Sequence, residues 1–214
     1  MGRREEAKEE RRERIIRAAR ELIRQTGDAG LSMRVLARTA GVSLTTPYNL
    51  FGSKRAIVLG ALQDVQPFAE AMEKLAGADP LARIFAAARI ATGLYEADPD
   101  FYRPMFVALF DISGGEEYRS LFGPSRHAFW RGLVEEAVAA GQLETGFDLD
   151  LFTSQIEQIF LSALLRWVTN EIPAEAMGPS VGYGFSLMLS GVAREGSRAD
   201  LAERRRAFEG ELAS

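Results

Sequence analysis

The segment from Leu31 to Arg55 constrains the fold of this chain more than any other stretch. Apolar residues recur at helical spacing up to Gly41, and a glycine just past a helix end suits the left-handed conformation that ends many helices. Ser32 is placed to cap this first short helix, and Ser43 to cap a second one after a tight turn. Two short helices joined in this way make a helix-turn-helix, whose second helix lies in the DNA major groove. A purely structural helix pair is the alternative.

The motif lies within a longer set of apolar and glycine positions between residues 14 and 62. These are Ile15, Ile16, Ala18, Ala19 and Leu22, then Gly27 and Gly30, the run AGVSLTTPYNLFGSK, and Ile57, Val58 and Leu59. With these residues the segment resembles the DNA-binding domain of the TetR family of one-component transcriptional regulators. Such regulators usually carry Gly-Thr-Leu-Tyr where this chain has Thr45-Thr46-Pro47-Tyr48. Pro47 removes one intrahelical bond, but we expect a small cost, because N–H groups in the first turn mostly lack intrahelical partners.

Geometry and resemblance together indicate which side chains would meet DNA. Polar side chains remain for the outer face of the second helix, while Leu50 and Phe51 anchor it from below. Lys54 follows Ser53, which is placed to cap a further helix, and helix N-termini favour phosphate. Arg34 on the preceding helix is placed to reach a base edge or a phosphate. The predicted DNA-contacting residues are Arg34, Ser43, Leu44, Thr45, Thr46, Tyr48, Asn49 and Lys54.

Charge is divided unevenly along the chain. Residues 1–55 hold 13 Lys and Arg against 7 Asp and Glu, whereas residues 56–214 hold 13 against 23, giving net charges of +6 and −10. A basic head on an acidic body is expected when the head meets a polyanion. The basic residues before position 13 are Arg3, Arg4, Lys8, Arg11 and Arg12. They form either a phosphate-binding arm or a solvated helix extension, because five glutamates are interleaved with them.

The remaining chain reads as successive helices without an alternating strand pattern. We therefore predict an all-α fold of about nine helices, as the TetR resemblance also implies. Residues 1–55 would form a three-helix helix-turn-helix domain, and residues 56–214 a larger helical domain for ligand binding and dimerisation. Within the latter, one helix is predicted from Ser53 to Leu75, and a frayed terminal helix from Arg198 to Leu212.

Aromatic residues are concentrated in the predicted central helices of the larger domain. Ordinary core packing explains any single one of them, and a surface or otherwise satisfied position explains His127. The resemblance implies a small-molecule cavity at the centre of this domain. A cavity lined by aromatic side chains would favour a hydrophobic or aromatic effector. The predicted effector-binding residues are Tyr95, Tyr102, Phe106, Phe110, His127, Phe129, Trp130 and Trp167.

Two long apolar segments, 152–170 and 174–196, are apolar on several faces. The resemblance implies that the last two long helices form a four-helix bundle with a second copy, so a homodimer on a near-palindromic operator is expected. The alternative is a helix pair that packs only within one chain. The predicted dimerisation residues are Ile156, Phe160, Leu164, Tyr183, Leu187 and Gly191.

Other features limit the class of function. The chain has no cysteine and one histidine, and it shows no metal-ligand cluster and no glycine-rich phosphate loop after a strand. An enzyme, a cofactor and a bound metal are therefore not expected, and neither a membrane span nor an apolar leader is predicted. The resulting hypothesis is a cytoplasmic, ligand-responsive repressor released from double-stranded DNA by a small lipophilic effector. A regulator without an effector, an architectural DNA-binding protein and a helical enzyme are the alternatives.

Overall fold

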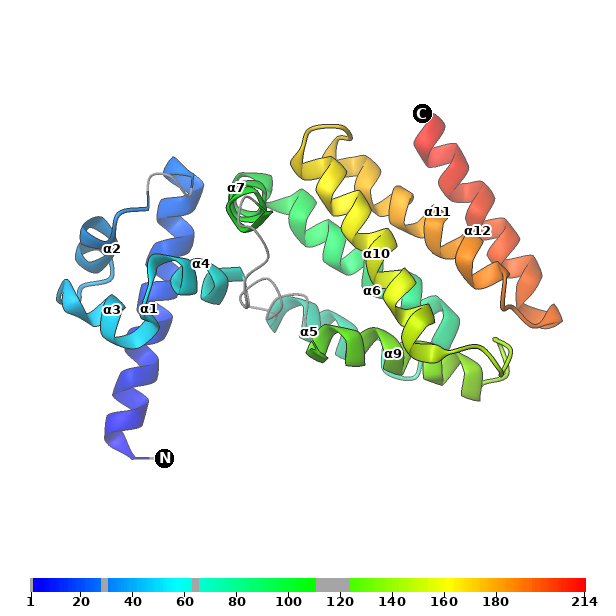
Figure 1. The fold of residues 1–214 in the computed structure, drawn as a ribbon, viewed down its shortest axis with the longest axis horizontal. Coiled ribbons are helices and arrows are strands. Elements are labelled where there is room, and N and C mark those ends of the chain that lie inside the picture. Colours follow the sequence, from blue (N-terminus) through cyan, green and yellow to red (C-terminus); the bar gives the residue numbers. More distant parts are fainter. Residues whose placement is uncertain (1, 28–30, 63–65, 111–123) are drawn as a thin grey trace. The chain divides into compact units, whose positions relative to one another are not determined.

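The structure is a computed structural model of the 214-residue chain, and it describes residues 2–27, 31–62, 66–110 and 124–214. In these ranges it contains eleven α-helices, one 3₁₀ helix and no strand, so the all-α prediction is confirmed (Figure 1). The helices are α1 (Arg3–Thr26), α2 (Met33–Thr39), α3 (Thr45–Phe51), α4 (Lys54–Leu62), α5 (Gln66–Glu73), α6 (Pro80–Ala97), α7 (Pro99–Phe110), α9 (Pro124–Ala139), α10 (Leu149–Val168), η2 (Ala174–Ala176), α11 (Met177–Ser190) and α12 (Glu195–Ala213).

The chain packs into two compact units that are not continuous in sequence. The first unit comprises residues 1–66 and 98–121, and the second comprises residues 67–97 and 122–214. The first unit therefore includes α4 and also α7, which follows α6 of the second unit. This division by packing lies elsewhere than the predicted boundary at residue 55. As a division of functions, domains 1–55 and 56–214 remain a prediction.

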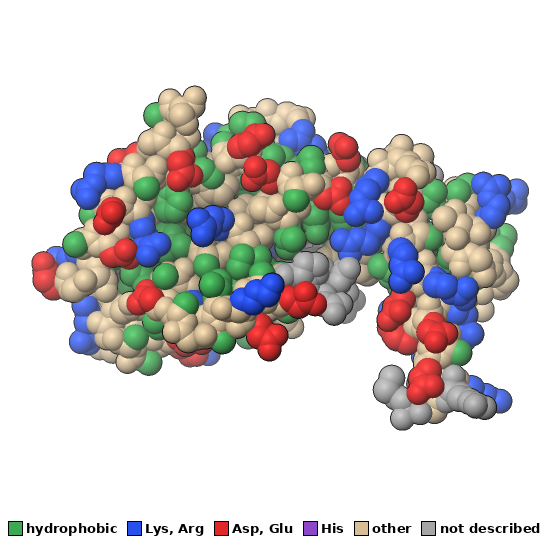
Figure 2. Space-filling view, turned by 180° about the vertical axis from the view of Figure 1, so that it is seen from behind, with side chains coloured by type: hydrophobic (Ala, Val, Ile, Leu, Met, Phe, Trp, Pro, Cys, Tyr) green, Lys and Arg blue, Asp and Glu red, His purple; other side chains and the backbone are tan. Residues whose placement is uncertain are grey.

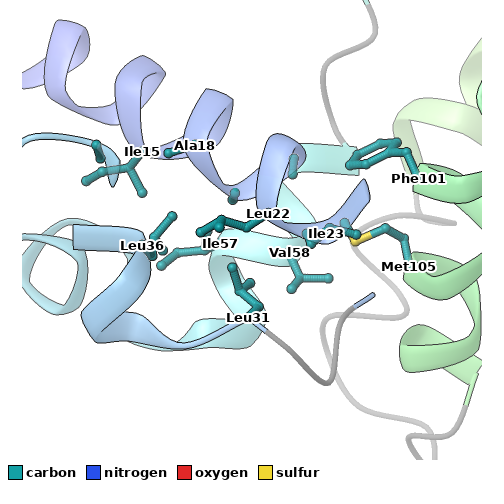
Figure 3. Packing of buried hydrophobic residues seen from close by; sticks show 13 residues of the cluster. Ile15, Ala18, Leu22, Ile23, Leu31, Leu36, Ile57, Val58, Phe101 and Met105 are labelled. Carbon is teal, nitrogen blue, oxygen red and sulfur yellow. The ribbon is translucent and has the colours of Figure 1, made fainter. Parts of the chain in front are cut away.

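The core of the first unit forms where α1, α2, α4 and α7 meet (Figure 3). Successive turns of α1 contribute its apolar face, and α4 packs against α1. Phe101 and Met105 of α7 are fully buried in the same cluster. The cluster consists of Ile15, Ala18, Ala19, Leu22, Ile23, Leu31, Leu36, Ala40, Ile57, Val58, Ala61, Phe101 and Met105.

Glycines bring the helices of the second unit close together. A Cβ atom on Gly184 of α11 would lie 2.6 Å from Ile159 Cγ2 of α10, and one on Gly182 would lie 2.6 Å from Cε1 and Cε2 of Phe208 on α12. Gly182 and Gly184 of α11 therefore allow the neighbouring helices to approach closely. Both approaches occur within one chain.

The terminal helix is longer and better packed than predicted. The sequence indicated a frayed helix over 198–212, but α12 extends from Glu195 to Ala213 and packs along α11. Leu201 is fully buried, and the Phe208 ring stacks on Phe85 of α6 with a centroid separation of 6.1 Å. The predicted helix from Ser53 to Leu75 is described as α4 and α5, and its continuity between them falls on residues 63–65, which lie outside the described residues.

Candidate nucleic-acid interface

The turn between α2 and α3 has the geometry that the sequence predicted. Gly41 adopts φ +65°, a left-handed conformation that disfavours any side chain. Its N–H donates to the Arg38 carbonyl at 3.2 Å, and the N–H of Val42 donates to the Ala37 carbonyl at 2.9 Å. These two bonds form a Schellman motif, which satisfies carbonyls at the end of α2 and turns the chain sharply. Gly41 thus fixes where α3 begins.

The serine caps predicted for α2 and α3 are wrong. Ser32 occupies the N-cap position of α2 without a side-chain capping bond. At α3 the N-cap residue is Leu44, while Ser43 Oγ lies 3.1 Å from Thr45 Oγ1 and 2.7 Å from Thr46 Oγ1. The Ser43 hydroxyl is therefore occupied by two other hydroxyls and not by the backbone. The backbone carbonyl of Ser43 accepts from the Thr46 N–H at 3.0 Å instead.

α3 has distinct inner and outer faces. Pro47, the third residue of the helix, is buried, while Leu50 and Phe51 pack partly buried against the core of the first unit. Its position in the first turn explains why the helix tolerates this proline, because an N–H there has no intrahelical acceptor. Four of the outward side chains are exposed, as predicted: Leu44, Thr45, Tyr48 and Asn49. Thr46 is half-buried.

Arg12 of α1 holds the far end of α3 in place, which the sequence did not indicate. Its Nη1 donates to the Leu50 carbonyl at 2.9 Å, and its guanidinium lies 4.5 Å from the Phe51 ring centroid. A cation at the last carbonyls of a helix is favourable, since those oxygens carry the negative end of the helix dipole. Arg12 therefore orients α3, a role that neither interpretation of the basic N-terminal segment included.

The basic N-terminal segment is helical. α1 begins at Arg3, so the helix-extension interpretation is confirmed for the backbone. Lys8 pairs with Glu5 at 3.3 Å and Arg12 approaches Glu9 at 3.9 Å, and Figure 2 shows acidic and basic side chains interleaved there. Exposed ion pairs of this kind are weak, so they leave the side chains free to exchange partners. A phosphate-binding role for this segment stays a prediction.

Two further predicted contacts lie beside the motif. Arg34 is exposed on α2, and among the described residues it has no ion-pair partner. Lys54 is the first residue of α4, whose N-terminus is capped as predicted, because the Ala56 N–H donates to Ser53 Oγ at 3.1 Å. Arg34 and Lys54 thus frame α3 from the helices before and after it.

The anchoring of α7 to α1 was also not predicted from the sequence. Asp98 Oδ2 accepts from Arg24 Nε at 2.9 Å and from Nη2 at 2.7 Å. The Arg20 and Arg24 guanidinium groups lie 4.7 and 5.3 Å from the Phe101 ring centroid. Asp98 directly precedes α7, which begins at Pro99. Its partner lies 74 residues away, and local sequence carries no signal for it.

An aromatic cluster lies inside the second unit. Tyr95 stacks on Trp167 with centroids 6.3 Å apart, and Trp130 contacts Phe160 at 6.3 Å. The ring centroids of Phe129 and Trp130 are 5.3 Å apart. Four of the predicted effector residues, Tyr95, Phe129, Trp130 and Trp167, therefore belong to this cluster. Two others, Tyr102 and Phe106, stack on each other in the first unit. The side chain of Phe110 lies outside the described residues.

His127 belongs to a charged network between α9 and α10. Its Nδ1 lies 3.0 Å from Glu157 and its Nε2 3.4 Å from Asp150. Hydrogen bonding to Glu157, and then to Asp150, raises the pKa of His127 despite the opposing effect of burial. Arg126 and Arg131 contact the same two carboxylates. These neighbours satisfy His127 within the protein, as the alternative interpretation of this residue expected.

The predicted dimerisation residues divide by exposure. Ile156, Phe160 and Leu164 are buried within the second unit, so this chain already covers their apolar surface. Leu187 and Gly191 are exposed and Tyr183 is half-buried on α11. The large apolar side chains that stay exposed on these two helices are Leu187 of α11 and Leu151 and Leu165 of α10.

Within the described ranges, no group of three or more His, Asp or Glu side chains has an arrangement that could hold a metal ion. No described helix is both long enough and apolar enough to cross a membrane.

Comparison with known proteins gives a consistent result. Residues 15–61 match the family model described as bacterial regulatory proteins, tetR family. No curated protein sequence matches the chain. The fold is similar to that of Thermus thermophilus FadR, a TetR family transcriptional repressor solved with lauroyl-CoA (25% identity, TM-score 0.71, 86% of this chain and 96% of that chain).

Two other solved structures are also similar. One is SmeT, the repressor of the Stenotrophomonas maltophilia multidrug efflux pump SmeDEF (18% identity, TM-score 0.66, 87% of this chain and 92% of that chain). The other is the transcriptional regulator FadR from Bacillus subtilis with stearoyl-CoA (21% identity, TM-score 0.61, 84% of this chain and 98% of that chain). Identities this low show the fold only.

Proposed function

We propose a specific mode of action for this chain, which belongs to the TetR family of bacterial regulatory proteins and is a DNA-binding transcriptional regulator. In our proposal it is a cytoplasmic repressor that leaves its operator when a small lipophilic effector binds. The observation that carries the proposal is the outward face of α3, exposed at the end of a Schellman turn and held by Arg12. This presentation suits a recognition helix in the major groove.

The proposed DNA contacts divide into two classes. Asn49 on α3 and Arg34 on α2 would contact base edges and so determine sequence preference, while Lys54 at the capped start of α4 would contact a phosphate. Removing a phosphate contact weakens binding about equally for all sequences and lowers the slope of log affinity against log salt by roughly one unit. Ser43, Leu44, Thr45, Thr46 and Tyr48 would complete the interface.

A homodimer is the proposed binding species. The exposed Leu187 on α11 and the exposed leucines of α10, Leu151 and Leu165, support it, because large apolar side chains in the open favour association. Two copies would place two recognition helices in successive major grooves, so half-site centres should lie about 34–36 Å apart or at a multiple of that. Leu187→Asp should split the dimer, which sedimentation velocity measures.

The proposed effector site is the aromatic cluster of the second unit. Tyr95, Phe129, Trp130 and Trp167 offer a mostly apolar lining, which suits a lipophilic compound. Thermus thermophilus FadR was solved with lauroyl-CoA, a ligand with a long acyl chain. The same rings already pack on one another, which favours the second candidate, a DNA-binding regulator without an effector.

A gel shift on the DNA flanking the coding sequence tests the proposed DNA role. Wild-type protein should give one discrete complex, Lys54→Ala should weaken it and lower the salt slope, and Asn49→Ala should change the preferred sequence. Lys74→Ala is the matched control, since it removes an exposed lysine of the second unit. Unchanged affinity and salt slope in Lys54→Ala would contradict the phosphate assignment.

Titration with lauroyl-CoA and other acyl-CoA thioesters, followed by tryptophan fluorescence, tests the effector. Coupling between two sites is reciprocal, so operator DNA should weaken effector binding by the same factor by which effector weakens DNA binding. A ligand that binds equally with and without operator is not an inducer. If no lipophilic compound binds while the discrete DNA complex persists, the regulator without an effector is supported.

A further inference from the structure

Two large hydrophobic side chains stand exposed at the start of α3. Leu44 is 46% exposed and Tyr48 is 49% exposed. Leu44 has helical dihedral angles (φ −56°, ψ −30°), so the two residues lie one turn apart on the same side of the helix. Elsewhere in the described part of the first unit, Val107 is the only other large hydrophobic residue that is exposed. An apolar pair at this position therefore needs a specific explanation.

The remaining outward residues of α3 limit which bases it can read. Between Ser43 and Ser53 the sequence has no Arg, Lys or Gln. Arg and Lys make the usual paired contacts with guanine, whereas Asn pairs with adenine. Asn49 is thus the one side chain of α3 suited to a paired base contact, and the base that it suits belongs to an A·T pair.

The hydroxyl groups beside Leu44 add little discrimination. Thr45 and Thr46 both contact the Ser43 hydroxyl, at 3.1 and 2.7 Å. Serine and threonine hydroxyls contact any base, so these three residues do not select one. Their mutual bonds also reduce the number of donors left for DNA. Base selection by α3 consequently falls to Leu44, Tyr48 and Asn49.

Resting on the proposed DNA-binding function, we infer that α3 reads A·T pairs, with Leu44 packed on the C5-methyl group of a thymine. The thymine methyl is the apolar group that base pairs present in the major groove, and apolar side chains contact it there. Tyr48 lies one turn further along the same side of α3, so its ring extends the apolar surface that Leu44 begins. Guanine, where the operator contains it, is read from α2 by Arg34.

Replacement of thymine by deoxyuracil tests this inference, because the two bases differ only in the methyl group. The preferred duplex is first selected from random DNA by the wild-type protein. Each thymine is then replaced by deoxyuracil in both half-sites, and affinity is measured by fluorescence anisotropy. A buried methyl contributes about a fourfold change in affinity, so one sensitive position should show about a fourfold loss per half-site and about sixteenfold for two.

The variant Leu44→Ala links the methyl group to its protein partner. It should bind more weakly and no longer distinguish thymine from deoxyuracil at the sensitive position, which is the coupling that a double-mutant cycle measures. Val107→Ala is the matched control, an exposed apolar residue of α7, and should retain the full difference. Because Leu44 is exposed, its removal should leave the circular dichroism and the melting temperature unchanged.

Each outcome has a separate meaning. A selective complex in which no thymine is sensitive, or in which Leu44→Ala keeps the full sensitivity, overturns the inference and leaves the DNA-binding function intact. A variant that changes sedimentation but not the thymine preference shows that Leu44 serves protein association, which also overturns it. If no duplex is selected at all, the proposed function fails first.

Discussion

The helices α7 and α12 are each seated on their own unit by opposite means. α7 inserts large side chains into the first unit, where Phe101 and Met105 are fully buried among residues of α1 and α4. α12 also buries one side chain, Leu201, but its Phe208 lies over a position without a side chain, Gly182 of α11. At α7, side chains of the helix fill a cavity in the core, whereas at α12 a ring packs directly on the backbone of a glycine.

This difference determines which mutations each seat tolerates. A filled hole loses contacts when its side chain is shortened, since close-packed interiors relax only partly around the cavity. A bare backbone is disturbed when a side chain is added, because the extra atoms force the neighbour out of its place. Shortening a buried side chain should therefore weaken the packing of α7, and adding a side chain at the glycine should weaken the packing of α12.

The largest effect is expected from Phe101→Ala. Truncation of a buried phenylalanine typically costs about 3–5 kcal/mol in the free energy of unfolding. Urea denaturation followed by circular dichroism measures it, with Val107→Ala on the same helix as a control that should change stability little. A loss below about 1 kcal/mol for Phe101→Ala would show that α7 is not held by its side chains.

The next largest effect is expected from Gly182→Ala. Its methyl group would meet Cε1 and Cε2 of Phe208 at 2.6 Å, and overpacking of this kind costs about 1–3 kcal/mol. Gly132→Ala in α9 is the matched control, because a Cβ there meets nothing within 4 Å and alanine favours a helix by about 1 kcal/mol.

Thermal melts of the two glycine variants should therefore shift in opposite directions. The double variant Gly182→Ala/Phe208→Ala should lose less stability than the sum of the two single losses, because the clash disappears with the ring. Equal stabilisation by both alanines would remove the proposed distinction between the two seats.

A smaller effect is expected from Arg24→Met, which sharpens the account of the α7 seat. The change keeps an apolar stem but removes both the bond to Asp98 and the guanidinium near Phe101. Half-exposed pairs of this type contribute about 1 kcal/mol or less. The difference from wild type in urea denaturation should shrink at high salt, because exposed charges are screened. A salt-independent loss would point to packing instead.

The smallest effect concerns His127, which joins α9 to α10 by charge. Its carboxylate partners raise its pKa above 6.5, so the stabilisation is fully present below 6.5 and is lost as pH rises through the higher folded value. The groups that face it are Glu157 and Asp150, themselves paired with Arg126 and Arg131.

Comparison with His127→Gln at several pH values tests this contribution. Wild type should exceed the variant by less than about 1 kcal/mol at acidic pH, and the excess should vanish at alkaline pH. Glutamine does not titrate, so effects of other groups cancel in the difference. An excess that grows with pH would contradict the sign.

The sequence predicted local features well and distant partners poorly. Gly41 was identified because a helix end followed by a turn restricts the residue type at one position. The inner and outer faces of α3 followed from residue spacing and the family resemblance together, whereas the Arg12 contact that orients this helix did not. In contrast, the burial of Phe101 depends on α1, which lies about 80 residues earlier, and periodicity within α7 shows only that one of its faces is apolar.

The glycines of α11 illustrate the same limit from another direction. Their small size permits close helix approach. The segment 174–196 was predicted to form part of a dimer interface, but Gly182 meets Phe208 and Gly184 meets Ile159 of the same chain. A small residue states how near a neighbour comes and carries no information on which neighbour it is.

The discontinuity of the first unit has a consequence during synthesis on the ribosome. The core residues from Ile15 to Ala61 are made first, and Phe101 and Met105 follow only after the whole of α6. At about 5–20 residues per second, the forty-residue interval from Ala61 to Phe101 takes about 2–8 s. For that time the nascent helix-turn-helix carries an uncovered apolar seat, so a pause in translation before Phe101 would prolong its exposure to chaperones and to neighbouring chains.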